Sequence, residues 1–251
     1  MRRTLTNFLA VLLLASVAAS AAEFWEKKDY RRWSEKDCRK MLQNSPWAKQ
    51  RIFSQVHITR LGVGGGVRGP QDDPTRRERQ ANPRITYQVQ LRSALPVRQA
   101  LVRLQQHRMG YDKLAEEERR AFDEQAEAFL RRDLSDVVVI YVMYGSTVRT
   151  DVLDLRRYWQ NQTTTTLKNT TFLIGRHGRK TDLKQYVVVK GGRQAFQFKF
   201  PRYVDGQPLV GSQDKSLQLE FVHPNIRGQG QERVLLEFKV KKMVVEDEVV
   251  Y

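Results

Sequence analysis

Apolar residues recur at every second position in two early segments of the chain. In RITYQVQL, residues 84–91, they are Ile85, Tyr87, Val89 and Leu91. The segment RIFSQVHITRL, residues 51–61, alternates in the same way. A period of two is typical of a strand with one buried face, so both segments are predicted to be strands. Glycine, proline and charged residues dominate the intervening residues 62–83, which predict a flexible loop.

Two helices are predicted after the second of these strands. The first begins at Pro96, a residue favoured at the first helical position, and ends at Gly110. Asp112 is the expected N-cap of the second helix. That helix is rich in charge, and four apolar residues define the side expected to be buried: Phe122, Ala126, Phe129 and Leu130.

Strand patterns dominate the remaining chain. Residues 137–144, VVVIYVMY, are apolar on both alternating faces and predict a central strand covered on each side. A short helix is predicted around residues 154–159. Five later segments read as strands: TLKNTTFLI, LKQYVVVK, QAFQFKF, SLQLEFV and RVLLEFKV. Helices clustered between groups of strands favour an α+β fold with a mainly antiparallel, β-sandwich-like sheet, a short N-terminal helix and an inserted helical pair laid over one face.

The N-terminal helix is predicted from FWEKKDYRRWSEKDCRKMLQNSPWAK, residues 24–49. Ser34 is a favourable N-cap and Asp37 follows at the capping-box position, which places Trp33 and Cys38 where a hydrophobic staple forms. Trp25 and Trp47 bracket this helix, so we interpret these tryptophans and Cys38 as a structural clamp. The alternative is an exposed aromatic platform for sugar rings or an apolar partner.

The start of the chain determines the expected compartment. Arg2 and Arg3 precede a short apolar run, and a small-residue ASA site follows at residues 19–21. This pattern is typical of a secretory signal peptide, residues 1–21, and the apolar run is shorter than a membrane span needs. We therefore expect a secreted or periplasmic protein whose residues 22–251 form a single domain. Cys38, the only cysteine, excludes an intramolecular disulfide.

The chain is strongly basic, with 44 Lys and Arg against 28 Asp and Glu, a net charge of +16. Such a balance favours polyanionic partners, namely an anionic lipid headgroup or an acidic polysaccharide, or an envelope protein. Nucleic acid is the least available polyanion outside the cytoplasm. The basic residues are dispersed rather than grouped in runs, which also fits a basic protein with charge spread over all its faces.

The sequence contains few signs of catalysis. Residues 64–69 match G-x-G-x-x-G, but PQDDP follows, so no helix can begin there to bind phosphates. The four histidines lie far apart without metal-ligand spacing. We therefore assign no catalytic, cofactor-binding or metal-binding residue and expect no cofactor. The turn at residues 175–182 is a candidate anion-binding site, or else a solvated hairpin tip, and its basic residues are Arg176, His177, Arg179 and Lys180.

Several motifs resemble those of a group of uncharacterised secreted proteins from acidobacteria. The first is FWxKKxYxxWSxxxCxxxLxxSPWA near the N-terminus. RSALPVRQAL, FPR and FKVKKMV follow it in the same order and extend the similarity over most of the chain. The resemblance implies a family but carries no activity with it.

Three functions are consistent with these features. The first is a binding or structural protein of the cell envelope, which the missing catalytic signatures favour over an enzyme. The second is a secreted hydrolase with an unrecognised site, which requires a cleft with converging Asp, His or Arg side chains and shifted pKa values. The third is a polyanion-binding module, which requires basic residues to cluster on one face.

Overall fold

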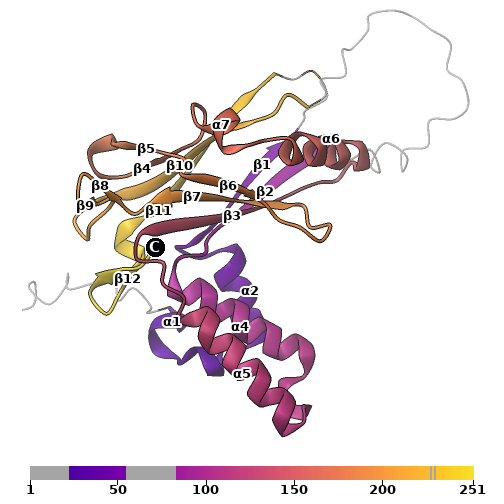
Figure 1. The fold of residues 1–251 in the computed structure, drawn as a ribbon, viewed down its shortest axis with the longest axis vertical. Helices are drawn as coiled ribbons and strands as arrows, with labels where there is room; N and C mark the ends of the chain where they lie inside the picture. Colours follow the sequence, from indigo (N-terminus) through magenta and orange to yellow (C-terminus); the bar gives the residue numbers. More distant parts are fainter. Residues whose placement is uncertain (1–22, 55–82, 227, 229) are drawn as a thin grey trace, which may run out of the picture.

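Two antiparallel β-sheets pack face to face in the computed structural model, which describes residues 23–54, 83–226, 228 and 230–251 (Figure 1). The first sheet has the order β1 (Ala48–Ser54), β2 (Arg84–Leu91), β3 (Val137–Ser146), β7 (Ala195–Pro201) and β6 (Gln185–Val188). The second has the order β11 (Glu232–Lys239), β10 (Ser216–His223), β4 (Phe172–Ile174) and β5 (Lys180–Asp182). The predicted α+β fold with mainly antiparallel sheets is confirmed. The predicted signal peptide, residues 55–61 of the first predicted strand and residues 62–82 of the predicted loop lie outside the described residues.

Aromatic rings fill the space between the sheets. The four apolar positions predicted to face inward on β2 are at most 3% exposed. Tyr87 on β2 meets Phe221 on β10 with ring centroids 5.4 Å apart, and Phe198 on β7 meets Phe221 at 5.8 Å. Because these contacts join opposite sheets, burial of the aromatic rings is what holds the sandwich together.

The central position of β3 follows from its sequence. It is the third of five strands in the first sheet, and it is hydrogen-bonded to β2 and β7. Its outward-facing Val139 and Tyr141 are buried like its inward-facing residues. The run of apolar residues on both faces therefore predicted this strand correctly.

Helix α6 (Arg149–Gln160) follows β3 and closes one end of the sandwich. Its Trp159 is 1% exposed, and its ring lies 6.2 Å from Tyr87 and 6.0 Å from Phe221, so it contacts both sheets. The helix predicted at residues 154–159 is real but about twice as long. Its first turn was missed because Val148, which has no capping side chain, precedes it.

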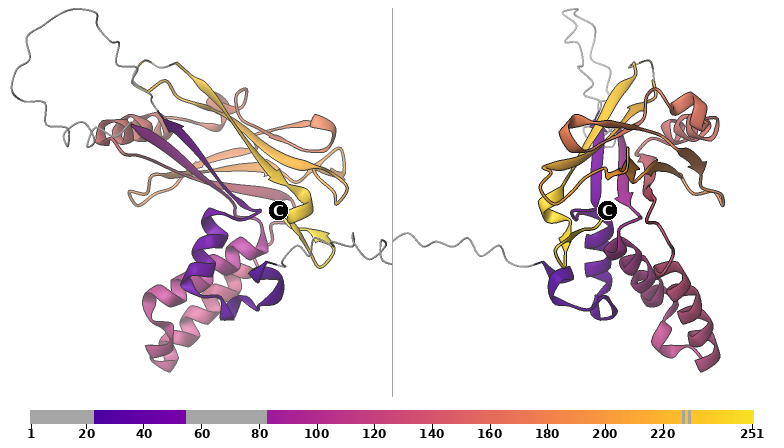
Figure 2. Two further views of the ribbon diagram at one scale, coloured as in Figure 1. Left: turned by 180° about the vertical axis from the view of Figure 1, so that it is seen from behind. Right: turned by 60° about the vertical axis from the view of Figure 1, so that its left-hand side comes forward.

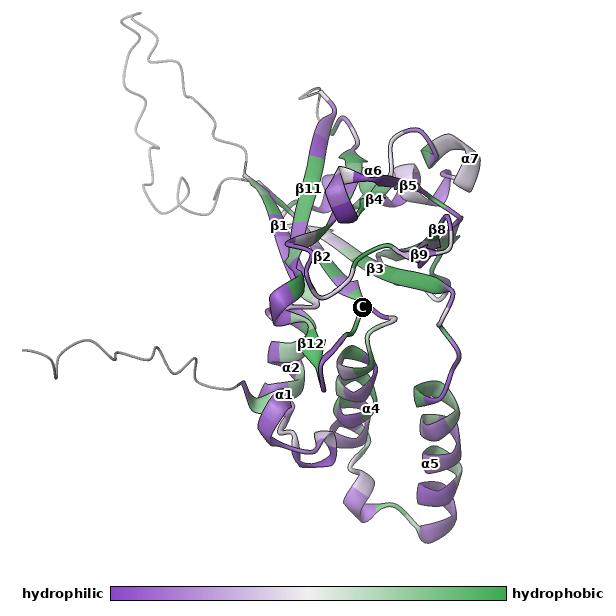
Figure 3. Cartoon of the chain, turned by 90° about the vertical axis from the view of Figure 1, so that its left-hand side faces the viewer, coloured by the Kyte–Doolittle hydropathy of each residue, from purple (hydrophilic) through white to green (hydrophobic). Residues whose placement is uncertain are grey.

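The other long helices gather at the opposite end of the sandwich, where they border the outer face of the first sheet without covering its length (Figure 1). They are α2 (Glu35–Gln43), α4 (Leu95–Met109) and α5 (Glu116–Leu130). Helix α4 begins one residue before Pro96 and ends where predicted, at Gly110, which takes the left-handed φ of 64° that glycine adopts without strain. Figure 3 shows α5 extending away from the sheets beside α4.

Two predictions for α5 are wrong. Asp112 does not cap it but lies in the short 3₁₀ helix η2 (Tyr111–Lys113), and the carboxylate of Glu118 accepts from the Ala115 N–H instead. The predicted buried side is wrong in extent: Phe122, Ala126 and Leu130 are half-buried, but Phe129 is 36% exposed and no residue of α5 is fully buried. The apolar periodicity of α5 is present, but only α4 lies close enough to pack on it extensively.

One further strand prediction is wrong in part. The first two residues of TLKNTTFLI, Thr166 and Leu167, belong to the short helix α7 (Thr164–Leu167), because the side chain of Thr163 accepts from the Thr166 N–H as an N-cap. Only β4 at the end of that segment is a strand.

Smaller elements complete the chain. They are α1 (Phe24–Lys27), η1 (Tyr30–Arg32), η3 (Arg176–Gly178), β8 (Tyr203–Val204), β9 (Gln207–Pro208), η4 (Val240–Lys242), β12 (Val244–Val245) and β13 (Glu248–Val249). Figure 2 shows the edge strands β1 and β11 side by side, and an ion pair of 3.1 Å joins Arg51 to Glu232 across them. No helix within the described ranges is long and apolar enough to cross a bilayer.

The residues of the predicted clamp lie together beneath the sandwich. Trp33, Cys38 and Trp47 are at most 2% exposed, and Trp25 is half-buried with its ring 5.8 Å from that of Trp47. Burial raises the pKa of the Cys38 thiol to about 11, so it stays protonated at neutral pH and is a poor nucleophile. These positions suit packing better than an exposed aromatic platform.

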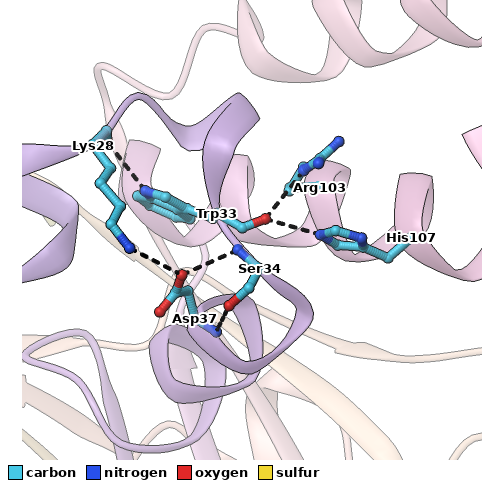
Figure 4. Close-up of polar contacts among 6 residues, drawn as sticks. All are labelled: Lys28, Trp33, Ser34, Asp37, Arg103 and His107. Atoms are coloured by element: carbon cyan, nitrogen blue, oxygen red, sulfur yellow. Dashed lines mark hydrogen bonds and ion pairs between the residues drawn. The ribbon is translucent and has the colours of Figure 1, made fainter. Parts of the chain in front are cut away.

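Hydrogen bonds fix the clamp to its neighbours (Figure 4). Ser34 and Asp37 form the predicted capping box, each accepting from the backbone N–H of the other at 3.1 Å. The carbonyl of Trp33 accepts from Arg103 Nε at 3.2 Å and from His107 Nε2 at 2.9 Å, both on α4. The start of α2 is thereby joined to α4.

We expect Trp47→Phe to lower the free energy of unfolding by about 2–3 kcal/mol. The indole Nε1–H of Trp47 donates to the Val250 carbonyl, and phenylalanine would lose this bond and leave unfilled volume in the core. Urea denaturation measures the change. Trp25→Phe is the matched control and should cost less than about 1 kcal/mol, because Trp25 is partly exposed. A cost below about 1 kcal/mol for Trp47→Phe as well would contradict the clamp.

Candidate anion-binding groove

A groove of about 1170 Å³ lies where α2 and α4 meet the outer face of the first sheet. We call it the arginine groove. Nineteen residues line it: Arg39, Leu42, Gln43, Asn44, Ala48, Lys49, Gln50, Thr86, Gln88, Gln90, Arg92, Leu101, Leu104, Arg108, Tyr141, Met143, Tyr144, Gly145 and Arg193. They come from β1, β2, β3, both helices and the turn between β6 and β7.

The floor of the groove is built from the polar face of β2. Gln90 is 2% exposed, and its Nε2 donates to the Leu42 carbonyl at 2.7 Å. Gln88 Nε2 lies 3.1 Å from the carbonyl of Gln43 and 3.2 Å from that of Lys49. The last carbonyls of a helix have no partner within it, so these amides satisfy the end of α2 and hold it on the sheet.

Arg92 follows β2 directly and is held in a defined position. Its guanidinium lies 3.4 Å from the ring centroid of Tyr141, a cation–π contact, and its Nε donates to Gln90 Oε1 at 3.3 Å. Burial lowers the pKa of Arg92 to about 10, and the nearby Arg193 acts in the same direction while Tyr141 opposes it. The guanidinium therefore remains charged at neutral pH.

All the ionisable lining residues other than tyrosine are basic. Arg39 is paired with Glu35 on α2, which does not line the groove. Lys49 is opposite Val89 in the strand register, so its side chain is on the face turned towards the second sheet. Arg92, Arg108 and Arg193 remain, and none of them forms an ion pair with a carboxylate of the described residues. The groove therefore has a positive potential suited to an anion.

The turn predicted as an anion site is arranged differently. Arg176 lies 3.2 Å from Asp214, Arg179 lies 3.2 Å from Asp205, and Lys180 lies 3.3 Å from Glu220. His177 is exposed with a left-handed φ of 55°. Arg176, His177 and Arg179 line a smaller cavity of about 360 Å³. Because a carboxylate accompanies each Arg and Lys side chain, an anionic ligand would have to compete for it; the site stays a prediction.

The sequence contains no signal for the arginine groove. Its arginines are spread between positions 39 and 193 and share no motif. The one local sign is that the last two polar positions of β2, Gln88 and Gln90, are both amides, which can donate hydrogen bonds to the end of a helix packed on the strand.

A second polar cluster bears on the hydrolase hypothesis. The Tyr87 hydroxyl lies 2.8 Å from His223 Nδ1, and Phe53 stacks on the imidazole with ring centroids 4.5 Å apart. Both polar residues are buried, and burial lowers the pKa of His223 to about 4. Among the residues described, no group of three or more His, Cys, Asp or Glu could hold a metal ion. The pair is typical of a buried histidine with its hydrogen bond satisfied.

Comparison with family models, with curated proteins and with solved structures finds no match to this chain. The resemblance to the acidobacterial group therefore stays a prediction, and the function has to be argued from the site itself.

We expect the free energy of unfolding to depend on pH because of His223. Its pKa is near 6.5 in the unfolded chain and about 4 in the folded one, so between these values the unfolded state binds more protons. Stability from this residue is full above pH 6.5, and about 2–3 kcal/mol of it is lost as the pH falls to 4. Urea denaturation from pH 7 to 4 measures the loss, and His223→Gln should have a flatter profile. Identical profiles would show that His223 is not buried in its neutral form.

Proposed function

We propose that the protein binds an acidic polysaccharide in the arginine groove, as a secreted or periplasmic binding protein. The observation that carries the proposal is the lining of the groove, where Arg92, Arg108 and Arg193 face no lining carboxylate. A guanidinium is suited to carboxylate and sulfate groups because its planar N–H groups bind two oxygens at once.

The other lining residues match the remaining chemistry of a sugar. Asn44, Gln50 and Thr86 offer amide and hydroxyl groups, which can exchange hydrogen bonds with sugar hydroxyls. Leu101 and Met143 are partly exposed in the same groove and provide apolar contact for the C–H faces of a sugar ring. The combination of cations, amides and a small apolar area fits an acidic saccharide better than a simple inorganic ion.

Two other polyanions fit the groove less well. A bilayer surface is flat, whereas Arg92 is half-buried between the sheet and the helices, where a lipid headgroup in a membrane would not reach it. Single-stranded nucleic acid stacks its bases on exposed aromatic rings, and the tyrosines of the groove, Tyr141 and Tyr144, are 3% and 6% exposed. A narrow, hydroxylated polymer can lie in the groove without stacking.

The proposed compartment supports the same partner. A signal peptide would deliver the protein to a space where acidic polysaccharides are accessible and nucleic acid is scarce. The proposed role is binding. It combines two of the hypotheses drawn from the sequence, a binding protein of the cell envelope and a polyanion-binding module.

We expect the double variant Arg108→Gln/Arg193→Gln to bind a fluorescently labelled heparin oligosaccharide about tenfold to a hundredfold more weakly than the wild type. Each lost charged contact at a partly exposed site is worth about 1 kcal/mol or more. Fluorescence anisotropy at fixed salt measures the affinity. Arg176→Gln/Arg179→Gln is the matched control, because it removes the same charge from the predicted turn, and we expect less than about a threefold loss.

Two results would contradict the proposal. Equal losses for both double variants would show that the overall charge rather than the groove attracts the polymer. Binding to vesicles containing phosphatidylglycerol but to no acidic polysaccharide would show that the partner is a lipid surface.

A further inference from the structure

We infer that Arg92 and Arg193 form an oxyanion subsite in the arginine groove, which takes one carboxylate or sulfate group of the bound polysaccharide. The inference rests on the proposed function and adds to it the residues that fix the position of the ligand. It separates these two arginines from Arg108, which contributes charge to the groove without a fixed geometry.

Arg92 is held before any ligand arrives. Its backbone N–H donates to the Val139 carbonyl at 2.7 Å, which attaches its base to β3. Its side chain lies flat on Tyr141, and Gln90 accepts from its Nε. A ligand therefore binds a guanidinium that has already lost most of its rotational freedom, and the entropic cost of binding is reduced.

Gln90, which holds Arg92, is itself held in place by a second hydrogen bond. Its Oε1 accepts from Arg92 while its Nε2 donates to the end of α2. Because Gln90 accepts from the Nε–H of Arg92, the terminal Nη1 and Nη2 groups are the donors that the proposed subsite would use. Two parallel N–H groups on one edge match the two oxygens of a carboxylate or sulfate.

Arg193 brings a second positive charge to the same place. It lies in the turn between β6 and β7, and the neighbouring Gln194 carbonyl accepts from the Tyr144 N–H of β3 at 2.9 Å. Arg193 is close enough to contribute to the lowered pKa of Arg92. Two guanidinium groups repel each other when no carboxylate lies between them, and no described carboxylate pairs with either. A bound oxyanion would relieve this repulsion.

Replacement by lysine tests the geometry without changing the charge. We expect Arg92→Lys to weaken heparin binding at least about tenfold, because lysine keeps the charge but cannot stack on Tyr141 or present two parallel N–H groups. Arg108→Lys makes the same replacement at the groove arginine that has no fixed geometry, and we expect a loss of affinity at least fivefold smaller than that of Arg92→Lys. Thermal melts of each variant establish that it is folded.

A second pair of variants tests the subsite without changing the partly buried Arg92. Arg193→Glu places a carboxylate where the ligand's oxyanion would lie, and we expect it to weaken binding at least about a hundredfold. Arg108→Glu makes the same change in charge, and we expect a loss at least fivefold smaller. Both positions are exposed, so neither substitution endangers the fold.

The source of the oxyanion is determined with two further polymers. Polygalacturonate carries only carboxylates and dextran sulfate only sulfates, so the polymer whose binding depends on Arg92 identifies the group. The subsite is contradicted if the wild type binds but the Arg92→Lys and Arg108→Lys variants lose the same affinity, and the two glutamate variants also lose the same affinity. Binding in the groove would still be supported in that case. If the wild type binds none of the three polymers, the proposed function itself fails.

Discussion

The attachment of α2 to the outer face of β2 is the interaction on which the arrangement of this molecule depends. The last carbonyl groups of a helix have no hydrogen-bond donor within the helix. Amide side chains on a strand carry N–H groups that need hydrogen-bond acceptors. Gln88 and Gln90 satisfy both requirements, because their amides donate to the carbonyls at the end of α2. One face of β2 therefore builds the sandwich core and the other attaches the helical end. Without that attachment the sheet and helices would share no groove.

Elements governed by local rules were predictable from the sequence. The alternation in β2, the apolar run of β3 and the capping box at Ser34 are each recognised from neighbouring residues alone, and each predicted element is present. Helix α5 shows where local rules fail. Its apolar residues have helical spacing, but burial needs a partner surface, and the chain places little more than α4 beside it. Arg98 instead ties the end of α5 to α4 by donating to the Leu130 carbonyl at 2.6 Å.

The candidate site could not be predicted for a related reason. A basic turn is visible in a sequence because its charges are adjacent, whereas its carboxylate partners come from distant segments and appear only in the fold. Asp205 and Asp214 offset the charge of that turn in this way. The opposite holds for the groove, since Arg92 and Arg193 are 101 positions apart in the sequence and line the same groove because β2, β3 and β7 are neighbours in the sheet. A net charge of +16 shows that basic residues outnumber acidic ones, but it does not show which arginines lie away from a carboxylate.

The tryptophans near the N-terminus also bear on the shape of the arginine groove. Trp33 is buried, and its carbonyl accepts from two side chains of α4, so the start of α2 is fixed to α4 at that point. Those two helices are the walls of the arginine groove. A clamp that joins them restricts movement of one wall against the other, and this would reduce the cost of ordering the site when a ligand binds. The dense packing of tryptophan therefore serves the proposed function indirectly: it never touches the ligand, but it determines the shape of the surface that does.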